Sequence, residues 1–241
     1  MALPVLNTPT YTLEIPSTKQ QTKYRPFLVK EEKIILIAMQ ETTTENPSAT
    51  VDAIKQIITN CTFGQVNPDK LTSYDLEYIF LQLKKKSSGS KIDLSFTCQN
   101  KIGDNICGTD NMVNFSLEDV KLVGGDNRES KIMITDTIGI KLKDPTFSEL
   151  EKFQSSDRSI ETLYGLLYTL IDTIFNGEEI CTPDTQDELK EFVDNLPTDK
   201  FEKVREYFEN IPKLKADIHI KCKKCGNDAT VSLEGLQSFL A

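Results

Sequence analysis

The sequence predicts an α+β fold: an N-terminal β-hairpin with helices, a central β-hairpin region, and C-terminal helices. Three observations predict it. Short segments of alternating apolar and polar residues indicate strands, longer segments with apolar residues at helical spacing lie between them, and two hairpin patterns end in a cysteine pair followed by glycine. The first pattern holds Cys98 and Cys107, and the second, about 120 residues later, holds Cys222 and Cys225.

Residues 1–89 are expected to form an N-terminal hairpin and helical region. Residues 11–15 alternate as a half-buried strand, and residues 22–28 return as its partner. Residues 30–40 predict a short helix that contains the block Ile-Ile-Leu-Ile at 34–37. Because this helix is apolar almost all round, it is expected to be buried in the core or against a partner.

Two amphipathic helices follow in the same region. The first begins at Ser48, a plausible N-cap, and Gly64 closes it. The second extends over residues 68–86 and ends at a Ser-Ser-Gly-Ser segment. Their apolar stripes consist of Val51, Ile54, Ile57 and Ile58 in the first helix, and Leu71, Leu76, Ile79, Phe80 and Leu83 in the second.

The remaining chain divides into a β-rich region and a helical region. Residues 90–145 are expected to hold the first cysteine hairpin and two more strands, after which the sheet ends. Residues 146–241 are expected to be helical and to finish in the second cysteine hairpin, which docks on residues 90–145. The predicted strands are 131–134 and 138–142, and the predicted helices are 147–153, 159–175, 184–196 and 198–209.

The two cysteine hairpins predict a zinc site. A glycine after a cysteine lets the backbone turn so that nearby amides can hydrogen-bond the thiolate, as in zinc knuckles. Cys98, Cys107, Cys222 and Cys225 make a complete tetrahedral ligand set for one structural Zn²⁺, with no open position for catalysis. Two other interpretations remain: ordinary small core residues, or the remnant of a site that no longer binds metal.

Composition narrows the classes of function. The net charge of -9 and pI near 4.8 argue against a nucleic-acid-binding surface, which needs excess cations. The basic run at 84–86 is typical of a helix C-terminus. No apolar run reaches the roughly 20 residues that span a bilayer, and the N-terminus lacks signal-peptide features. We therefore expect a cytosolic protein with reduced thiols and no membrane-spanning segment.

No catalytic site is indicated, and we expect a protein that is not an enzyme. The single His219 lies in an alternating strand, so no Ser-His-Asp or Cys-His arrangement can be defended. Cys61 fits a small packed residue, and Cys181 has no assignable role. A hydrolase using clustered carboxylates is the less favoured alternative. The acidic clusters, expected to be solvated, are Glu31-Glu32, Asp75 with Glu77, Glu178-Glu179, and Asp184, Asp187 and Glu188.

Apolar helical residues suggest a binding surface. The block at 34–37 and the aromatic side chains Tyr74, Tyr78 and Phe80 offer more hydrophobic faces than one polar exterior readily covers. The alternative is that these faces pack against each other.

Three motifs resemble one viral family: residues 24–33 (YRPFLVKEEK), 60–64 (NCTFG) and 74–81 (YDLEYIFL). With 138–145 and the C-terminal Cys-Lys-Lys-Cys-Gly, they resemble baseplate hub proteins of T-even-type contractile-tailed bacteriophages. The resemblance implies a non-enzymatic assembly protein, made in the host cytosol, that binds other hub or tape-measure proteins as a chaperone. The alternative is a permanent subunit of the hub in the virion tail.

Overall fold

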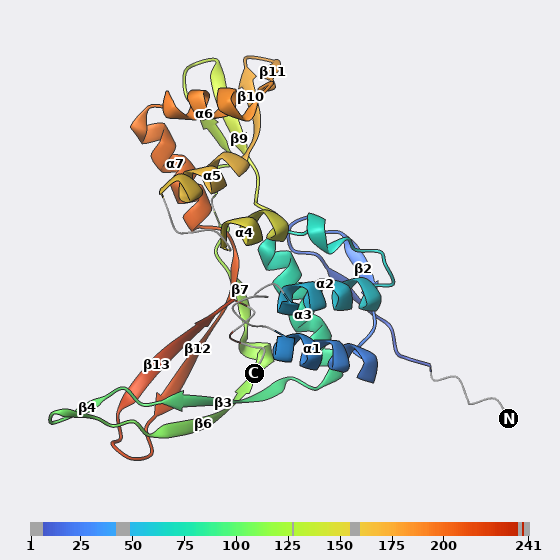
Figure 1. The fold of residues 1–241 in the computed structure, drawn as a ribbon, viewed down its shortest axis with the longest axis vertical. Helices are drawn as coiled ribbons and strands as arrows, with labels where there is room; N and C mark the ends of the chain where they lie inside the picture. The colour runs from blue at the N-terminus through green and yellow to red at the C-terminus, as the bar shows by residue number, and fades with distance from the viewer. Residues whose placement is uncertain (1–6, 42–48, 127, 155–159, 236–237, 239–241) are drawn as a thin grey trace. The chain divides into compact units, whose positions relative to one another are not determined.

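The chain forms two compact units, and we describe each by itself. The computed structural model describes residues 7–41, 49–126, 128–154, 160–235 and 238 (Figure 1). Unit 1 comprises residues 1–68, 74–123 and 213–241, and unit 2 comprises residues 69–73 and 124–212. Unit 2 is thus inserted into the sequence of unit 1. Helices and antiparallel sheets together give the α+β class that the sequence predicts.

The N-terminal part of unit 1 is a hairpin followed by helices. The strands β1 (Tyr11–Glu14) and β2 (Gln21–Tyr24) pair antiparallel, which confirms the predicted hairpin. The helices are α1 (Val29–Glu41), α2 (Ala49–Cys61) and α3 (Ser73–Ser87), with the 3₁₀ turn η1 (Pro68–Lys70) before α3. The apolar stripes of α2 and α3 are buried, as the spacing predicts, and include Ile57, Ile58, Ile79, Phe80 and Leu83.

Two long hairpins complete unit 1. Strands β3 (Lys91–Thr97) and β6 (Asp110–Ser116) pair antiparallel, as do β12 (Lys213–Lys221) and β13 (Asp228–Glu234). We call these the first hairpin and the second hairpin. The short strand β7 (Lys121–Val123) pairs with the start of β12. Alternate residues of both hairpins face one apolar core made of Leu81, Ile92, Leu94, Phe115, Leu117, Val120, Leu214, Ala216, Ile218 and Ile220.

Unit 2 is a four-stranded antiparallel sheet with helices. The strand order is β11-β10-β9-β8, and the strands are β8 (Lys131–Met133), β9 (Ile138–Leu142), β10 (Ile171–Asn176) and β11 (Glu179–Cys181). The helices are α4 (Phe147–Gln154), α5 (Ile160–Thr169), α6 (Gln186–Asp194) and α7 (Thr198–Glu209). Their core consists of Ile132, Ile140, Leu142, Leu167, Leu170, Ile174, Val204 and Tyr207.

One predicted helix is wrong over its second half, and the sheet does not end at residue 142. The single helix expected over 159–175 is α5 followed by strand β10, which pairs with β9, and β11 extends the sheet further. The segment 169–174 is rich in β-branched residues, which favour strands. Gly177, at φ +62°, then makes the tight turn into β11 instead of ending a helix.

Other boundaries shift less. The helix predicted from residue 68 begins at Ser73, after the 3₁₀ turn. Ser48, the predicted N-cap of α2, and Ser159, the predicted start of α5, lie outside the described residues. Gly64, at φ +71°, ends α2 as expected, and its N–H donates to the carbonyl of Thr59 at 2.8 Å.

The apolar side chains that suggested a binding surface divide into two groups. Tyr74 and Phe80 are buried inside unit 1, so on α3 the interpretation of mutual packing is correct. On α1 the buried residues are only Glu31 and Ala38. The exposed large apolar side chains of α1 are Val29, Leu36, Ile37 and Met39, which we call the α1 outer face.

Candidate metal centre

The four predicted cysteines lie together where the tips of the two hairpins meet. Cys98 follows β3 directly, and Cys222 follows β12 directly, while Cys107 and Cys225 lie in the turns that lead back to β6 and β13. The hairpins lie side by side with their tips at the same end (Figure 1). Residues more than 100 positions apart in the sequence are thereby brought into contact.

The sulfur atoms form a compact cluster. All four Sγ atoms lie within 4.8 Å of one another. Two sulfur pairs join one hairpin to the other: Cys98 to Cys225 at 3.7 Å, and Cys107 to Cys222 at 3.8 Å. These distances are far longer than the roughly 2.05 Å of a disulfide bond, so the cysteines are free thiols.

The two turns share a backbone arrangement. In the second hairpin, Cys222 N–H donates to Asn227 O at 2.8 Å, and Gly226 N–H donates to Cys222 O at 2.9 Å. In the first, Cys98 N–H donates to Thr109 O at 2.9 Å, and Gly108 N–H donates to Cys98 O at 3.0 Å. Both glycines have positive φ, +62° and +71°, which explains why glycine follows each returning cysteine.

The wide spacing between Cys98 and Cys107 has a simple structural cause. Residues between them form a small hairpin of β4 (Lys101–Ile102) and β5 (Asn105–Ile106). At its base, Cys107 N–H donates to Asn100 O at 2.8 Å. The extra residues therefore project as an outgrowth, and the two thiols remain neighbours.

Backbone and side-chain donors surround the sulfur atoms. The N–H groups of Cys225 and Lys224 hydrogen-bond Cys222 and lower its thiol pKa to about 6. The hydroxyl and N–H of Thr109 lower the pKa of Cys107. The N–H of Asn100 acts in the same direction on Cys98, but burial and the three neighbouring thiols outweigh it and raise the pKa of Cys98 to about 12. Hydrogen-bond donors thus favour the thiolate form of Cys222 and Cys107, the form that binds a metal ion, whereas burial and the neighbouring thiols oppose it at Cys98.

The donor set favours a structural metal over a catalytic one. Cys107 and Cys222 are buried, while Cys98 and Cys225 are partly buried. The ligand set of this cluster consists of four thiols alone. His219, as expected, lies on the outer face of the second hairpin, where Nδ1 is 2.9 Å from the hydroxyl of Thr230. Four thiolates close a tetrahedral shell and leave no position for water or substrate.

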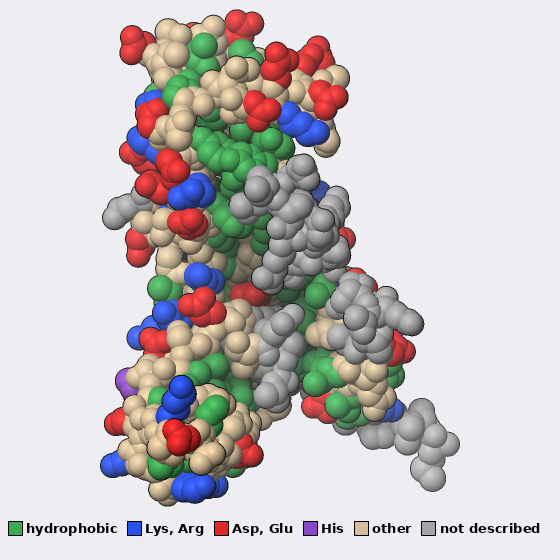
Figure 2. Space-filling model, turned by 60° about the vertical axis from the view of Figure 1, so that its left-hand side comes forward, with side chains coloured by type: hydrophobic (Ala, Val, Ile, Leu, Met, Phe, Trp, Pro, Cys, Tyr) green, Lys and Arg blue, Asp and Glu red, His purple; other side chains and the backbone are tan. Residues whose placement is uncertain are grey.

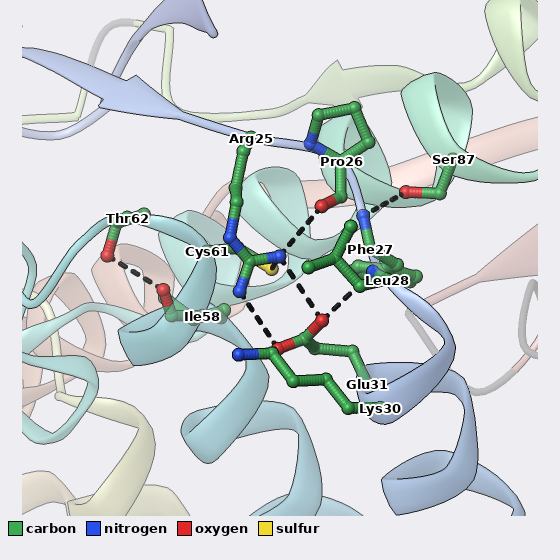
Figure 3. Close-up of polar contacts among 10 residues, drawn as sticks. All are labelled: Arg25, Pro26, Phe27, Leu28, Lys30, Glu31, Ile58, Cys61, Thr62 and Ser87. Atoms are coloured by element: carbon green, nitrogen blue, oxygen red, sulfur yellow. Dashed lines mark hydrogen bonds and ion pairs between the residues drawn. The ribbon is translucent and has the colours of Figure 1, made fainter. Parts of the chain in front are cut away.

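Arg25 and Glu31, which the sequence analysis assigned no paired role, form a second polar cluster in unit 1 (Figure 3). The Arg25 guanidinium donates to the Glu31 carboxylate at 2.9 and 3.2 Å, and also to Pro26 O at 3.0 Å. Glu31, the third residue of α1, accepts from the N–H of Leu28 at 2.9 Å, as in a capping box. This network explains the physical role of the conspicuous YRPFLVKEEK motif, because it joins β2 to the start of α1.

Burial and nearby polar groups together set the protonation states of Glu31 and Cys61. Glu31 is fully buried, and burial alone would raise its pKa, but Arg25, the Leu28 N–H and Lys30 hold it below its usual value. Cys61 is also fully buried, and burial raises its pKa to about 11, so it is a neutral thiol and a packed residue, as expected.

The acidic clusters differ from the expectation in two cases. Glu31 is not solvated, and neither is Asp75, which is buried and accepts hydrogen bonds from the N–H and hydroxyl of Ser17. Glu188 does act at a helix N-terminus: its N–H donates to the Thr185 hydroxyl at 3.2 Å, and its carboxylate accepts from the Asp184 N–H. Cys181 is exposed at the end of β11, not in a loop.

The surface offers no continuous basic region on the face drawn in Figure 2, where acidic and basic side chains are interspersed. Among the described helices, none combines the length and apolar character needed to cross a membrane.

Comparison with known protein families identifies the family of this chain. A model of the family described as T4 bacteriophage base plate protein matches residues 8–241. Comparison with curated proteins and with solved structures gave no match. The match covers nearly the whole chain, so the protein belongs to this T4-type phage baseplate family.

Proposed function

We propose that this baseplate protein is a non-catalytic assembly factor that binds other hub or tape-measure proteins while the baseplate hub is built in the host cytosol. In this proposal a Zn²⁺ ion at the cysteine cluster fixes the shape of unit 1, and the α1 outer face binds the partner. The observation that carries the proposal is this exposed apolar helix face on a protein of a baseplate family.

The spacing of the sulfur atoms supports zinc. With a Zn–S distance of about 2.3 Å, the edge of a regular tetrahedron of sulfurs is about 3.8 Å. The Cys98–Cys225 and Cys107–Cys222 sulfur pairs are 3.7 and 3.8 Å apart, and all pairs lie within 4.8 Å. A small closure of the tips would therefore complete the tetrahedron. The ion would also balance the negative charge of its thiolate ligands.

Metal content tests this part of the proposal. The protein, purified under reducing conditions, is expected to contain one zinc per chain by plasma mass spectrometry. Cys225→Ser removes a partly buried ligand and should lower that content strongly, whereas the same change at the exposed Cys181 should not. Absence of zinc after purification and after addition of Zn²⁺ would contradict the metal assignment.

The α1 outer face supports a binding function. Val29 and Leu36, which lie about two helical turns apart, are 66% and 62% exposed. Ile37 and Met39 are 53% and 50% exposed. Val29, Leu36 and Ile37 are at i, i+7 and i+8, a spacing by which a helix presents anchor residues to a partner. Exposed apolar groups gathered on one helix are costly in water, so a face of this kind is typical of a protein that binds a partner.

A pull-down from infected cells tests the face directly. We expect the tagged protein to retain baseplate hub or tape-measure proteins, and Leu36→Gln to lose them. Met112→Gln is the matched control, because Met112 is 67% exposed on β6 of the same unit but is not part of α1. Equal retention by both variants would refute the α1 outer face as the binding surface.

Mass spectrometry of purified virions distinguishes an assembly factor from a permanent hub subunit. We expect the protein to be absent or far below the copy number of the structural proteins. Stoichiometric presence would replace the assembly-factor proposal with the structural one.

A further inference from the structure

We infer that Asn111 is a positioning residue for the metal centre: it holds the Cys-Lys-Lys-Cys turn against the first hairpin, so that the four thiols are placed before metal binds. The inference rests on the proposed zinc site and adds a residue that is not itself a ligand. Asn111 lies on β6, and its side chain is the one buried amide among the described residues.

The Asn111 amide makes three hydrogen bonds, two within the first hairpin and one to the second. Its Nδ2 donates to Thr109 O at 2.9 Å and to Phe96 O at 3.4 Å, both in the first hairpin. Its Oδ1 accepts from the N–H of Lys223 at 3.0 Å, a contact that spans 112 residues. The partners fix the orientation of the amide, since two carbonyls require the NH₂ group and one N–H requires the oxygen.

The hydrogen bond from Lys223 to Asn111 matters because of where Lys223 lies in the sequence. Lys223 lies between Cys222 and Cys225, so the amide oxygen holds the backbone of the turn that carries both second-hairpin ligands. Thr109, held by the other end of the amide, is the residue whose hydroxyl lies 3.3 Å from the Cys107 sulfur. Asn111 therefore touches the chain beside three of the four thiols without contributing a ligand.

Loss of the amide should weaken zinc binding in particular. Without it, the Lys223 N–H loses its partly buried hydrogen bond and the turn is free to move away from Cys98 and Cys107. Outer-shell partners of metal ligands typically contribute 10–100-fold to affinity. We expect the zinc Kd of Asn111→Ala to rise by about that factor, and each tenfold corresponds to about 1.4 kcal/mol.

The experiment measures zinc affinity by competition with a chromophoric chelator, alongside urea unfolding of the metal-free and zinc-bound full chain. Variants are Asn111→Ala and the near-isosteric Asn111→Leu, which keeps the packing if alanine prevents folding. Asn114→Ala is the control, because Asn114 lies on the same strand but is exposed and donates only to Asp93. A Co²⁺ absorption spectrum reports the ligand geometry.

The expected result is a zinc Kd at least tenfold higher for both Asn111 variants, a broadened Co²⁺ spectrum, and a larger loss of stability with zinc than without it. A zinc Kd within threefold of wild type, or equal weakening by Asn114→Ala, would overturn the inference while leaving the zinc site intact. Failure of the wild-type chain to bind zinc would overturn both.

Discussion

Replacing Glu31 by glutamine should test whether the buried Arg25–Glu31 pair determines the stability of unit 1. Glutamine has nearly the same shape, and its amide oxygen can still accept from the Leu28 N–H. The substitution removes the negative charge that faces Arg25 and replaces one of the two acceptor oxygens with an NH₂ donor. Because Glu31 is fully buried and Arg25 is 8% exposed, the guanidinium would remain inside the protein without its counter-charge.

The structure gives the expected size of the effect. Removing one partner of a buried ion pair costs about 3–5 kcal/mol, whereas an exposed pair contributes about 0–1 kcal/mol. Arg25 retains a hydrogen bond to Pro26 O and a contact of 3.7 Å with the Cys61 sulfur, so we expect about 3 kcal/mol for Glu31→Gln. The double change Arg25→Met with Glu31→Leu should cost less than the two single changes together.

Urea denaturation followed by circular dichroism measures these free energies, since the chain has no tryptophan to report by fluorescence. Hydrogen exchange of α2 peptides assigns the transition to unit 1. The control is Glu234→Gln, because Glu234 pairs with Lys213 at 3.3 Å while both side chains are about half exposed. A loss below about 1 kcal/mol for Glu31→Gln, equal to that of the control, would refute a structural role for the pair.

Three further outcomes are expected. Acidification should destabilise unit 1 through Glu31, because folding lowers the pKa of this carboxyl group. The stability that Glu31 contributes is complete above its unfolded-state pKa of about 4.3 and is lost as the pH falls through its folded-state pKa. Glu31→Gln should remove this part of the pH dependence of stability, measured by urea titrations. A chelator should increase hydrogen exchange at the tips of both hairpins but not in α2, and unchanged tips would contradict a bound metal. Gly139→Ala should destabilise unit 2 by about 1–3 kcal/mol in thermal unfolding. The added Cβ would overlap the Phe175 ring and lie 2.9 Å from Ile132 O, and wild-type stability would refute that packing.

The sequence was most informative where local chemistry repeats. Each hairpin combines period-two alternation with a glycine that only a positive φ explains, so the strands and the meeting of four thiols could be predicted together. The segment 159–175 misled because leucines at helical spacing continue into β-branched residues. Residues 171–176 form strand β10 because they pair with β9, which lies about thirty residues earlier in the sequence. The periodicity of a short segment does not reveal such a distant pairing.

Two polar contacts could not be predicted for a related reason. Arg25 follows strand β2 and Glu31 lies in helix α1, so no single strand or helix period relates the two residues. The bond from Lys223 to Asn111 connects residues 112 positions apart, and an asparagine in an alternating strand carries no signal of its partner. Only folding reveals either contact.

The insertion of unit 2 between β7 and β12 delays the synthesis of β12 relative to its partner strand. Val123 pairs with Lys213 in the finished protein, but the ribosome adds the intervening residues at about 5–20 per second, so β12 follows several seconds after β7. Throughout that interval the inward side of the nascent first hairpin has no β12 to cover Ile92, Leu94 and Phe115. This apolar surface is therefore exposed to self-association until β12 emerges from the ribosome.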